Sequence, residues 1–322
     1  MAEQDPRANR REAIFPIIGS TLTMLNLHSH TPKGCGDVFC MCAAYLLPCI
    51  ILLLILLLMV GFNAYFITLS LELNVNWRIG AAVVAMVFGN AASAVLLWAF
   101  LGVTLTGAGY VPPIPWKYPP RYVGDRSDFQ PSVLAPIEGF NPNSVTQLNY
   151  MNRLRYCVPC DQFKPDNAYH CAFCSRCTYE FDHHCPVMNN CIGRNNYKLF
   201  VTFLVYAGIV GFLNGGLLLI AIFVLEVGDY NILWLMLPII MVMVAAPPFC
   251  FGLLHVWWVY HGESTMSRHV ASFNRERSRQ PTRQQLERRR RAHWDAVLGT
   301  DRRWWRMILP LKPRWLASEE TV

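Results

Sequence analysis

The sequence predicts an α-helical polytopic membrane protein with four transmembrane helices and a small cysteine-rich domain between the second and third helix. Three observations support this fold class. The 322 residues are 53% hydrophobic and only 15% charged, which is not the composition of a soluble domain. The apolar residues gather in four runs, each long enough to cross a bilayer, which takes about 20 residues. Seven of the twelve cysteines lie within 157–191, between the second and third runs.

The four apolar runs are interpreted as membrane spans because of their length. The first contains an unbroken apolar stretch over 46–60, and its length disfavours the alternative of a buried helix in a soluble protein. A short polar link, 72–78, leads to the second span. Pro247-Pro248 predicts a kink in the fourth. The predicted spans are 38–65, 79–103, 199–225 and 232–260.

The charge distribution predicts the orientation of these spans. Lys and Arg number 4 before the first span, 9 in the loop 104–198 and 14 after the fourth span. The two short loops on the opposite side hold one, Arg78. The positive-inside rule therefore places both termini and the central loop in the cytosol. This topology also explains the net charge of +7 better than nucleic-acid binding does, so no nucleic-acid partner is expected.

These features divide the chain into five regions. No cleavable signal peptide is expected, because polar and charged residues precede the first apolar run. The run Arg288–Arg291 in the tail predicts a contact with anionic lipid headgroups. The expected regions are a cytosolic N-terminal arm (1–37), the first two helices (38–103), the cytosolic cysteine-rich domain (104–198), the last two helices (199–260) and a basic cytosolic tail (261–322).

The cysteine-rich segment repeats the Cys-x-x-Cys spacing, with histidines between the repeats. Short knuckles of this kind aim two thiolates at one metal ion, and a cytosolic location argues against disulfides. Two tetrahedral zinc sites need eight ligands. The six cysteines other than Cys185, with two histidines, supply that number. One zinc would take Cys157, Cys160, His170 and Cys177, and the other Cys171, Cys174, His184 and Cys191. Other pairings remain open at this point.

The count leaves His183 and Cys185 without a metal. Pro186 favours an extended backbone at Cys185, where alternate side chains point to opposite faces. His183 and Cys185 would then share one face while His184 points to the other. A histidine beside a cysteine can take its proton and leave a nucleophilic thiolate. Asp182 would orient His183, provided that a turn at 182–183 brings it to the same face. The alternatives are a structural thiol and an outer hydrogen-bond partner.

At these residues the chain resembles the DHHC family of protein S-acyltransferases, whose tetrad here is Asp182-His183-His184-Cys185. The match continues through Asn189-Asn190-Cys191-Ile192-Gly193 and Asn196-x-x-x-Phe200, and includes Lys164-Pro165. The four-span layout is also that of the family. Weaker similarities to family motifs occur at Thr106–Pro113 and Gly262–Ser267. Two further segments, Trp294–Gly299 and Trp304–Pro310, resemble the part of the family's tail that packs back on the protein. The resemblance implies a small zinc-bound cytosolic domain of short β-hairpins.

The chain departs from the family pattern at five positions. Gly107 and Ala108 stand where the family has Asp-Pro, and Ser267 where it has glutamate. Asn167 replaces an arginine and Val187 a tryptophan. These departures concern how the domain braces against the helices and how acyl-CoA is held, not the expected nucleophile, base or ligands.

The resemblance implies a two-step transfer of a palmitoyl group from palmitoyl-CoA, through a Cys185 thioester, to cysteines of membrane-associated substrate proteins. Arg194 and Lys198 are candidates to meet the CoA phosphates. Small side chains in the third span would leave room for the acyl chain, or else serve close helix packing. They are Ala207, Gly208, Gly211, Gly215 and Gly216.

The expected location is an endomembrane, Golgi or ER, or the plasma membrane. Two other functions were weighed. A catalytically silent zinc-bearing adaptor would need a damaged nucleophile or base, and both are intact. A transporter or channel would need intramembrane charges that the spans lack.

Overall fold

The computed structural model describes residues 35–73, 75–116, 145, 147, 149, 154–225, 232–273, 283–301 and 303–315. Its four long helices confirm the predicted spans, since each is long and apolar enough to cross a membrane. The expectations for 1–34, for much of the loop 104–198 and for the short loop after the third span lie outside the described residues. The long helices are α2 (Cys35–Glu72), α3 (Asn76–Leu105), α5 (Tyr197–Ile220) and α6 (Ile232–His261), with a π-helical turn, Ala221–Leu225, at the end of α5.

The ends of these helices differ from the predicted ends. Glu72 still belongs to α2 and α3 begins at Asn76, so the polar link between them is 73–75 rather than 72–78. Polar residues extend the helices past the apolar runs because main-chain hydrogen bonding does not require apolar side chains. In the fourth span, α6 continues as one helix through Pro238, Pro247 and Pro248.

The small residues of α5 serve mainly to bring α6 close. A Cβ atom added at Gly208 or Gly211 would lie 2.2 Å from a carbon atom of α6, and at Gly215 it would lie 3.2 Å from one. Such close approach is the usual role of small residues between membrane helices. Of the two alternatives, room for an acyl chain or close helix packing, these three glycines follow the second. At Gly216, by contrast, an added Cβ would meet nothing within 4 Å.

Polar pairs also join the long helices. Asn63 on α2 and Asn90 on α3 exchange two hydrogen bonds between their amides, at 2.9 and 2.7 Å. Asn214 on α5 donates to Ser93 on α3 at 2.9 Å. Because lipid offers no partner to an amide, these bonds favour one mutual arrangement of the three helices.

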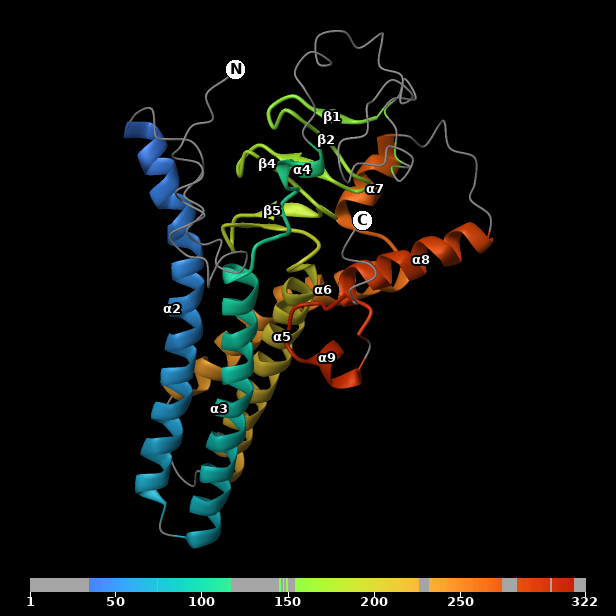
Figure 1. Cartoon of the computed structure of the whole chain (residues 1–322). Coiled ribbons are helices and arrows are strands. Elements are labelled where there is room, and N and C mark those ends of the chain that lie inside the picture. The colour runs from blue at the N-terminus through green and yellow to red at the C-terminus, as the bar shows by residue number, and fades with distance from the viewer. Residues whose placement is uncertain are drawn as a thin grey trace.

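The cysteine-rich domain consists of three two-stranded antiparallel hairpins, as the family resemblance implied. Figure 1 shows them at one end of the bundle, beyond the end of α3. The strands are so short because each hairpin is closed by a knuckle or turn. The hairpins pair β1 (Tyr156–Cys157) with β2 (Gln162–Phe163), β3 (Tyr169–Cys171) with β4 (Arg176–Thr178), and β5 (His183–Cys185) with β6 (Asn190–Ile192).

Two asparagines attach this domain to the end of α3. The Asn190 amide donates to the carbonyl of Thr106 at 2.7 Å, and the Asn196 amide donates to the same carbonyl at 3.1 Å. The segment after α3 then runs along the domain, where the fully buried Ala108 accepts from the Asn195 N–H at 3.1 Å. Gly109 has a φ of +92°, which favours glycine. At the position where the family has Asp-Pro, a main-chain hydrogen bond therefore holds the segment after α3 against the cysteine-rich domain.

The chain after α6 returns to the helix bundle through three shorter helices. Figure 1 shows α8 running outward from beside α6 and α9 lying beside α5. The Trp294 indole donates to the carbonyl of Val259 at 2.7 Å, and the Tyr206 hydroxyl donates to that of Ile308 at 2.9 Å. The helices are α7 (Thr265–Phe273), α8 (Arg283–Leu298) and α9 (Trp304–Ile308); a fourth short helix, α4 (Pro113–Trp116), precedes the hairpins.

Candidate active site and metal sites

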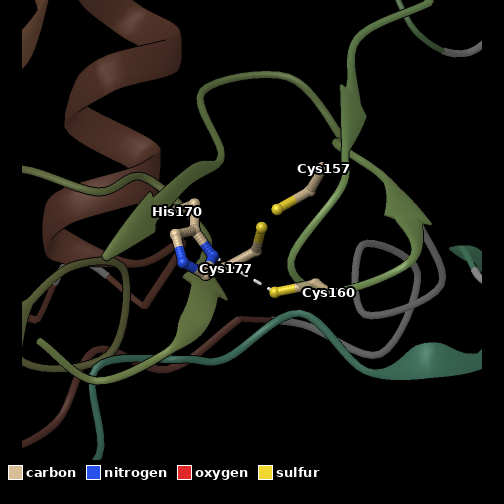
Figure 2. Close-up of side chains that lie close together, drawn as sticks. All are labelled: Cys157, Cys160, His170 and Cys177. Carbon is tan, nitrogen blue, oxygen red and sulfur yellow. Dashed lines mark hydrogen bonds between the residues drawn. The ribbon is translucent and has the colours of Figure 1, made fainter. Parts of the chain in front are cut away.

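The first cluster of potential ligands is formed between two hairpins (Figure 2). Cys157 and Cys160 lie at the turn between β1 and β2, while His170 and Cys177 are direct register partners on β3 and β4. Partners in register point to the same face of a hairpin. The donor atoms of all four residues lie within 4.8 Å of one another, with Cys160 Sγ 3.2 Å from His170 Nδ1.

The second cluster repeats this construction one hairpin further along. Cys171 and Cys174 come from the turn between β3 and β4, and the register partners His184 and Cys191 come from β5 and β6. His184 Nδ1 lies 3.7, 3.5 and 3.8 Å from the sulfur atoms of Cys171, Cys174 and Cys191. The two sets interleave because each takes a knuckle from one hairpin and a cross-strand pair from the next.

Both clusters have the chemistry and spacing of a tetrahedral metal site. Three thiols and one imidazole suit zinc, and metal–sulfur bonds of about 2.3 Å set sulfur atoms about 3.8 Å apart. The cysteines are not in disulfides. Asp161 and Ser175, each directly after the second cysteine of a knuckle, have φ angles of 52° and 50°, which turn the chain sharply. Each cluster could therefore hold one metal ion, in the two sets expected from the sequence.

The Asp-His-His-Cys tetrad divides between this scaffold and a separate group. His184 points into the second cluster, whereas His183 Nδ1 lies 2.7 Å from Asp182 Oδ2 and Cys185 is a neighbour of the His183 side chain. Strand β5 begins at His183, so Asp182 precedes the paired strand and escapes its alternation. The Asp182 N–H donates to the carbonyl of Ile192 at 2.9 Å, which holds Asp182 beside the end of β6.

Residues 150–272 match the family described as DHHC palmitoyltransferase. The chain carries a DHHC domain. It is 35% identical over 126 residues to "Probable protein S-acyltransferase 14" of Arabidopsis thaliana, covering 39% of this chain and 39% of that protein. It is 34% identical over 117 residues to "Palmitoyltransferase PFA3" of Eremothecium gossypii, covering 36% and 34%. With "Palmitoyltransferase spe-10" of Caenorhabditis elegans it shares 28% over 179 residues, covering 48% and 50%.

The matches therefore span half or less of the length of these curated relatives. The family match over 150–272 includes the hairpins and the tetrad, so the family resemblance seen in the sequence is confirmed.

The Asp182 carboxylate and the His183 imidazole stabilise each other's charged forms. Burial alone would raise the pKa of Asp182, but hydrogen bonds from His183 and Thr265 hold it below its ordinary value. Burial alone would lower the pKa of His183, but its interactions with Asp182 and Cys185 raise it to about 9. The arrangement thus favours an imidazolium at His183 beside the Asp182 carboxylate.

The start of α7 also contacts the DHHC domain. The main-chain N–H of Thr265 donates to Asp182 Oδ1 at 2.8 Å. Ser264 and Ser267 cap this helix reciprocally: the Ser264 N–H donates to Ser267 Oγ at 2.8 Å, and the Ser267 N–H donates to Ser264 Oγ at 3.1 Å. A serine thus completes a capping box at the position where the family has glutamate.

Cys185 lies where the DHHC domain meets the membrane helices. It is 6% exposed and belongs to a cluster of buried apolar side chains drawn from α2, α3, α5 and α8. Members of this cluster include Phe100 on α3 and Phe203 on α5, whose rings lie 5.5 Å apart. Val187, where the family has tryptophan, packs against the same cluster. Cys185 therefore lies among apolar side chains of the helix bundle.

The two residues expected to meet CoA phosphates, Arg194 and Lys198, both contact the C-terminal tail. Lys198 is only 3% exposed, and its ammonium donates to the carbonyls of Arg306 and, at 3.0 Å, of Leu311. Because these bonds occupy the ammonium in a buried place, the expected phosphate contact of Lys198 is not supported. The Arg194 guanidinium lies 4.5 Å from the ring centre of Trp315 and remains half-buried.

Some neighbours of His183 were missed by the sequence analysis. His255, from the interior of α6, lies against the His183 ring with centroids 6.5 Å apart, and Phe200 lies 5.2 Å from His183. Phe200 belongs to a motif that the family resemblance marked. The sequence does show that His255 is an ionisable side chain inside an apolar span, and such residues usually have a functional role.

Proposed function

We propose that this protein is a protein S-acyltransferase that moves a palmitoyl group from palmitoyl-CoA to cysteines of membrane-associated substrate proteins. The observation that carries the proposal is the position of His183, whose Nδ1 lies 2.7 Å from Asp182 Oδ2 and whose ring has Cys185 as a neighbour. This is the nucleophile–base–carboxylate arrangement of covalent acyl transfer. The palmitoyltransferase names of the relatives support the same reaction.

In the first step, the Cys185 thiolate attacks the carbonyl carbon of the acyl-CoA thioester. A bond forms between Cys185 Sγ and this carbon, and the bond from the carbon to the CoA sulfur breaks. His183, protonated by Cys185, returns that proton to the CoA thiolate as it leaves. Asp182 keeps the His183 ring in the required tautomer and stabilises its cation.

In the second step, the thiol of a substrate cysteine gives its proton to His183 and attacks the Cys185 thioester. The acyl carbon forms a bond to the substrate sulfur, and its bond to Cys185 breaks. Cys185 leaves as a thiolate and recovers the proton from His183. No water, oxidant or reductant is consumed, so each cycle ends with the enzyme in its starting state.

The apolar surroundings of Cys185 suit a long-chain acyl donor. Exposing the chain to water costs about 0.8 kcal/mol per CH2 group, and the cluster around Cys185 includes side chains of three membrane helices. Arg194 is the remaining candidate to attract CoA phosphates, since it lies in the DHHC domain close to the bundle. The lipid bilayer is the second partner of the protein.

The two ligand clusters would each hold one zinc ion. Three thiolates and one imidazole in each cluster match the donors that structural zinc prefers, with no position left for substrate. Zinc would contribute folding energy to hairpins that have little core of their own. Cys157, Cys160, His170 and Cys177 would hold one ion, and Cys171, Cys174, His184 and Cys191 the other.

The proposed orientation places the DHHC domain, both termini and the tail in the cytosol of an endomembrane, Golgi or ER, or at the plasma membrane. The Lys and Arg distribution supports it, with a single such residue, Arg78, in the two opposite loops. The cytosol supplies acyl-CoA and keeps the ligand cysteines reduced.

The decisive experiment incubates the purified full chain, in lipid nanodiscs, with radiolabelled palmitoyl-CoA. We expect label that is removed by neutral hydroxylamine in the wild type and is absent in Cys185→Ser. Label that persists in Cys185→Ser would refute the assignment of the nucleophile. No label in folded wild-type protein that carries two zinc ions would refute the transferase proposal and favour a membrane adaptor.

A further inference from the structure

His255 is a buried histidine that the acyl-transfer steps do not use. It lies in the last third of α6 and has no exposed surface. Its Nδ1 lies 2.9 Å from the hydroxyl of Tyr197, the first residue of α5. Its Nε2 has no hydrogen-bond partner within the described part of the chain. A histidine this deep in a membrane helix is costly and requires a specific role.

The surroundings of His255 hold its ring in one orientation. The rings of Phe251 and Trp258, one turn before and one turn after it on α6, lie 4.5 and 4.8 Å away, both nearly perpendicular to it. Phe200 packs against it at 5.3 Å from α5. With the Tyr197 hydroxyl as the remaining contact, the ring can neither flip nor tilt without losing packing or a buried hydrogen bond.

This fixed ring lies against the candidate base. The His183 and His255 centroids are 6.5 Å apart with the planes tilted by 42°, and Phe200 touches both imidazoles. Asp182 and Cys185 lie beside His183 within the hairpin domain. His255 and Phe200 pack against the same ring from the membrane helices, which limits the movement of the ring out of its position.

Two other roles for His255 fit the geometry less well. As an alternative base it would need a hydrogen bond to Asp182 or Cys185, and neither nitrogen makes one: Nδ1 lies at the Tyr197 hydroxyl, and Nε2 has no hydrogen-bond partner among the described residues. As an ordinary structural link between α5 and α6 it would be unnecessary, because those helices already meet through the glycines of α5.

We propose that His255, held by Tyr197, is a positioning residue that keeps the His183 imidazole aligned between Asp182 and Cys185. The proposal rests on the proposed function, in which His183 is the base. It connects the packing of α5 and α6 to the position of the catalytic base. A shift between the two helices would move His255, and His183 would move with it. A misplacement of about 1 Å is enough to slow such a reaction markedly.

The test uses Tyr197→Phe, His255→Phe and the double variant in the full chain. Each single substitution keeps an aromatic ring and removes the same hydrogen bond. We expect the rate of Cys185 acylation at saturating palmitoyl-CoA to fall about tenfold in each single variant, the value of one lost hydrogen bond. The KM for palmitoyl-CoA should not change. The double variant should be no slower than the slower single, because the bond is shared.

The matched control is His261→Phe, an exposed histidine six residues later on the same helix, which should acylate at the wild-type rate. Thermal unfolding and zinc content should match the wild type, and Tyr197→Phe, which loses one oxygen atom, is the variant that decides if His255→Phe does not fold. Wild-type rates in Tyr197→Phe would overturn the proposal, as would single effects that multiply in the double variant.

A second measurement does not depend on acyl transfer. The rate at which iodoacetamide alkylates Cys185 reports its activation by His183, with His261→Phe as the control variant. We expect slower alkylation of Cys185 in both single variants than in the wild type and in His261→Phe. If wild-type protein fails to acylate but this difference appears, the transferase proposal is wrong and the positioning role stands. Equal alkylation in all variants would overturn the positioning role.

Discussion

The main-chain N–H of Thr265 donates a 2.8 Å hydrogen bond to Oδ1 of Asp182, 83 residues earlier in the chain. The start of α7, which follows the fourth span, is thereby joined to the carboxylate that orients His183. Ser264 and Ser267 cap this helix start. The substitution of serine for the family's glutamate therefore leaves a helix cap in place.

Breaking this cap should slow the reaction without unfolding the protein. Ser267→Ala removes one half of the capping box, and loss of a cap costs about 1 kcal/mol of helix stability. We expect a several-fold lower rate of Cys185 acylation, measured with labelled palmitoyl-CoA. Ser267→Glu should restore the rate, since glutamate completes a capping box with Ser264. A Ser267→Ala enzyme with the wild-type rate would show that the cap does not position Asp182.

Asp182→Asn should impair catalysis while leaving the metal sites intact. The amide cannot stabilise a cation on His183, so the pKa of His183 falls from about 9 towards its ordinary value. We expect the acylation rate to drop by about 10²- to 10⁴-fold, the usual contribution of a positioned base. Zinc content, measured by mass spectrometry, should stay at two ions per chain. A loss of zinc would place Asp182 in the scaffold instead.

Metal binding should separate the ligands from the nucleophile. Cys171→Ala removes a thiol from the second cluster, so we expect loss of zinc and a lower unfolding temperature. Cys185→Ala should keep two zinc ions per chain, because Cys185 belongs to neither cluster. Metal analysis of both purified variants checks this, and equal zinc loss would contradict the ligand sets.

Lys198→Met should loosen the C-terminal tail. The substitution leaves the carbonyls of Arg306 and Leu311 without their donor, and each unsatisfied buried group costs about 1–3 kcal/mol. We expect a lower unfolding temperature and faster proteolysis within 303–315. Arg283→Met, at an exposed position on α8, is the control and should behave as the wild type. An unchanged proteolysis rate in Lys198→Met would mean that other contacts hold the tail.

The small residues of α5 provide a paired test of helix packing. Gly208→Val would place a side chain into α6, whereas Gly216→Val would enter open space. Overpacking costs about 1–3 kcal/mol, so the unfolding temperature should fall in Gly208→Val alone. Thermal unfolding in nanodiscs distinguishes the two. If both variants were equally stable, the close contact between α5 and α6 would not hold in the membrane.

Much of this architecture follows from local pattern. The length of the apolar runs predicts four spans, because a bilayer requires about 20 apolar residues whatever packs beside them. The number and spacing of the cysteines predicted two interleaved sets of ligands, because a knuckle places both of its thiols within a few residues. The same counting left His183 and Cys185 outside the metal sites.

Other features depend on contacts between residues far apart in the sequence. No local pattern places Thr265 on Asp182, His255 against His183, or the carbonyl of Leu311 on Lys198. Nor could spacing decide whether the glycines of α5 make room for an acyl chain or for α6. The sequence by itself determined the spans and the donor sets, since burial in lipid and knuckle geometry act locally. Only the packing of the helices and the return of the tail decided what surrounds the base, because a side chain's partners are set by the whole fold.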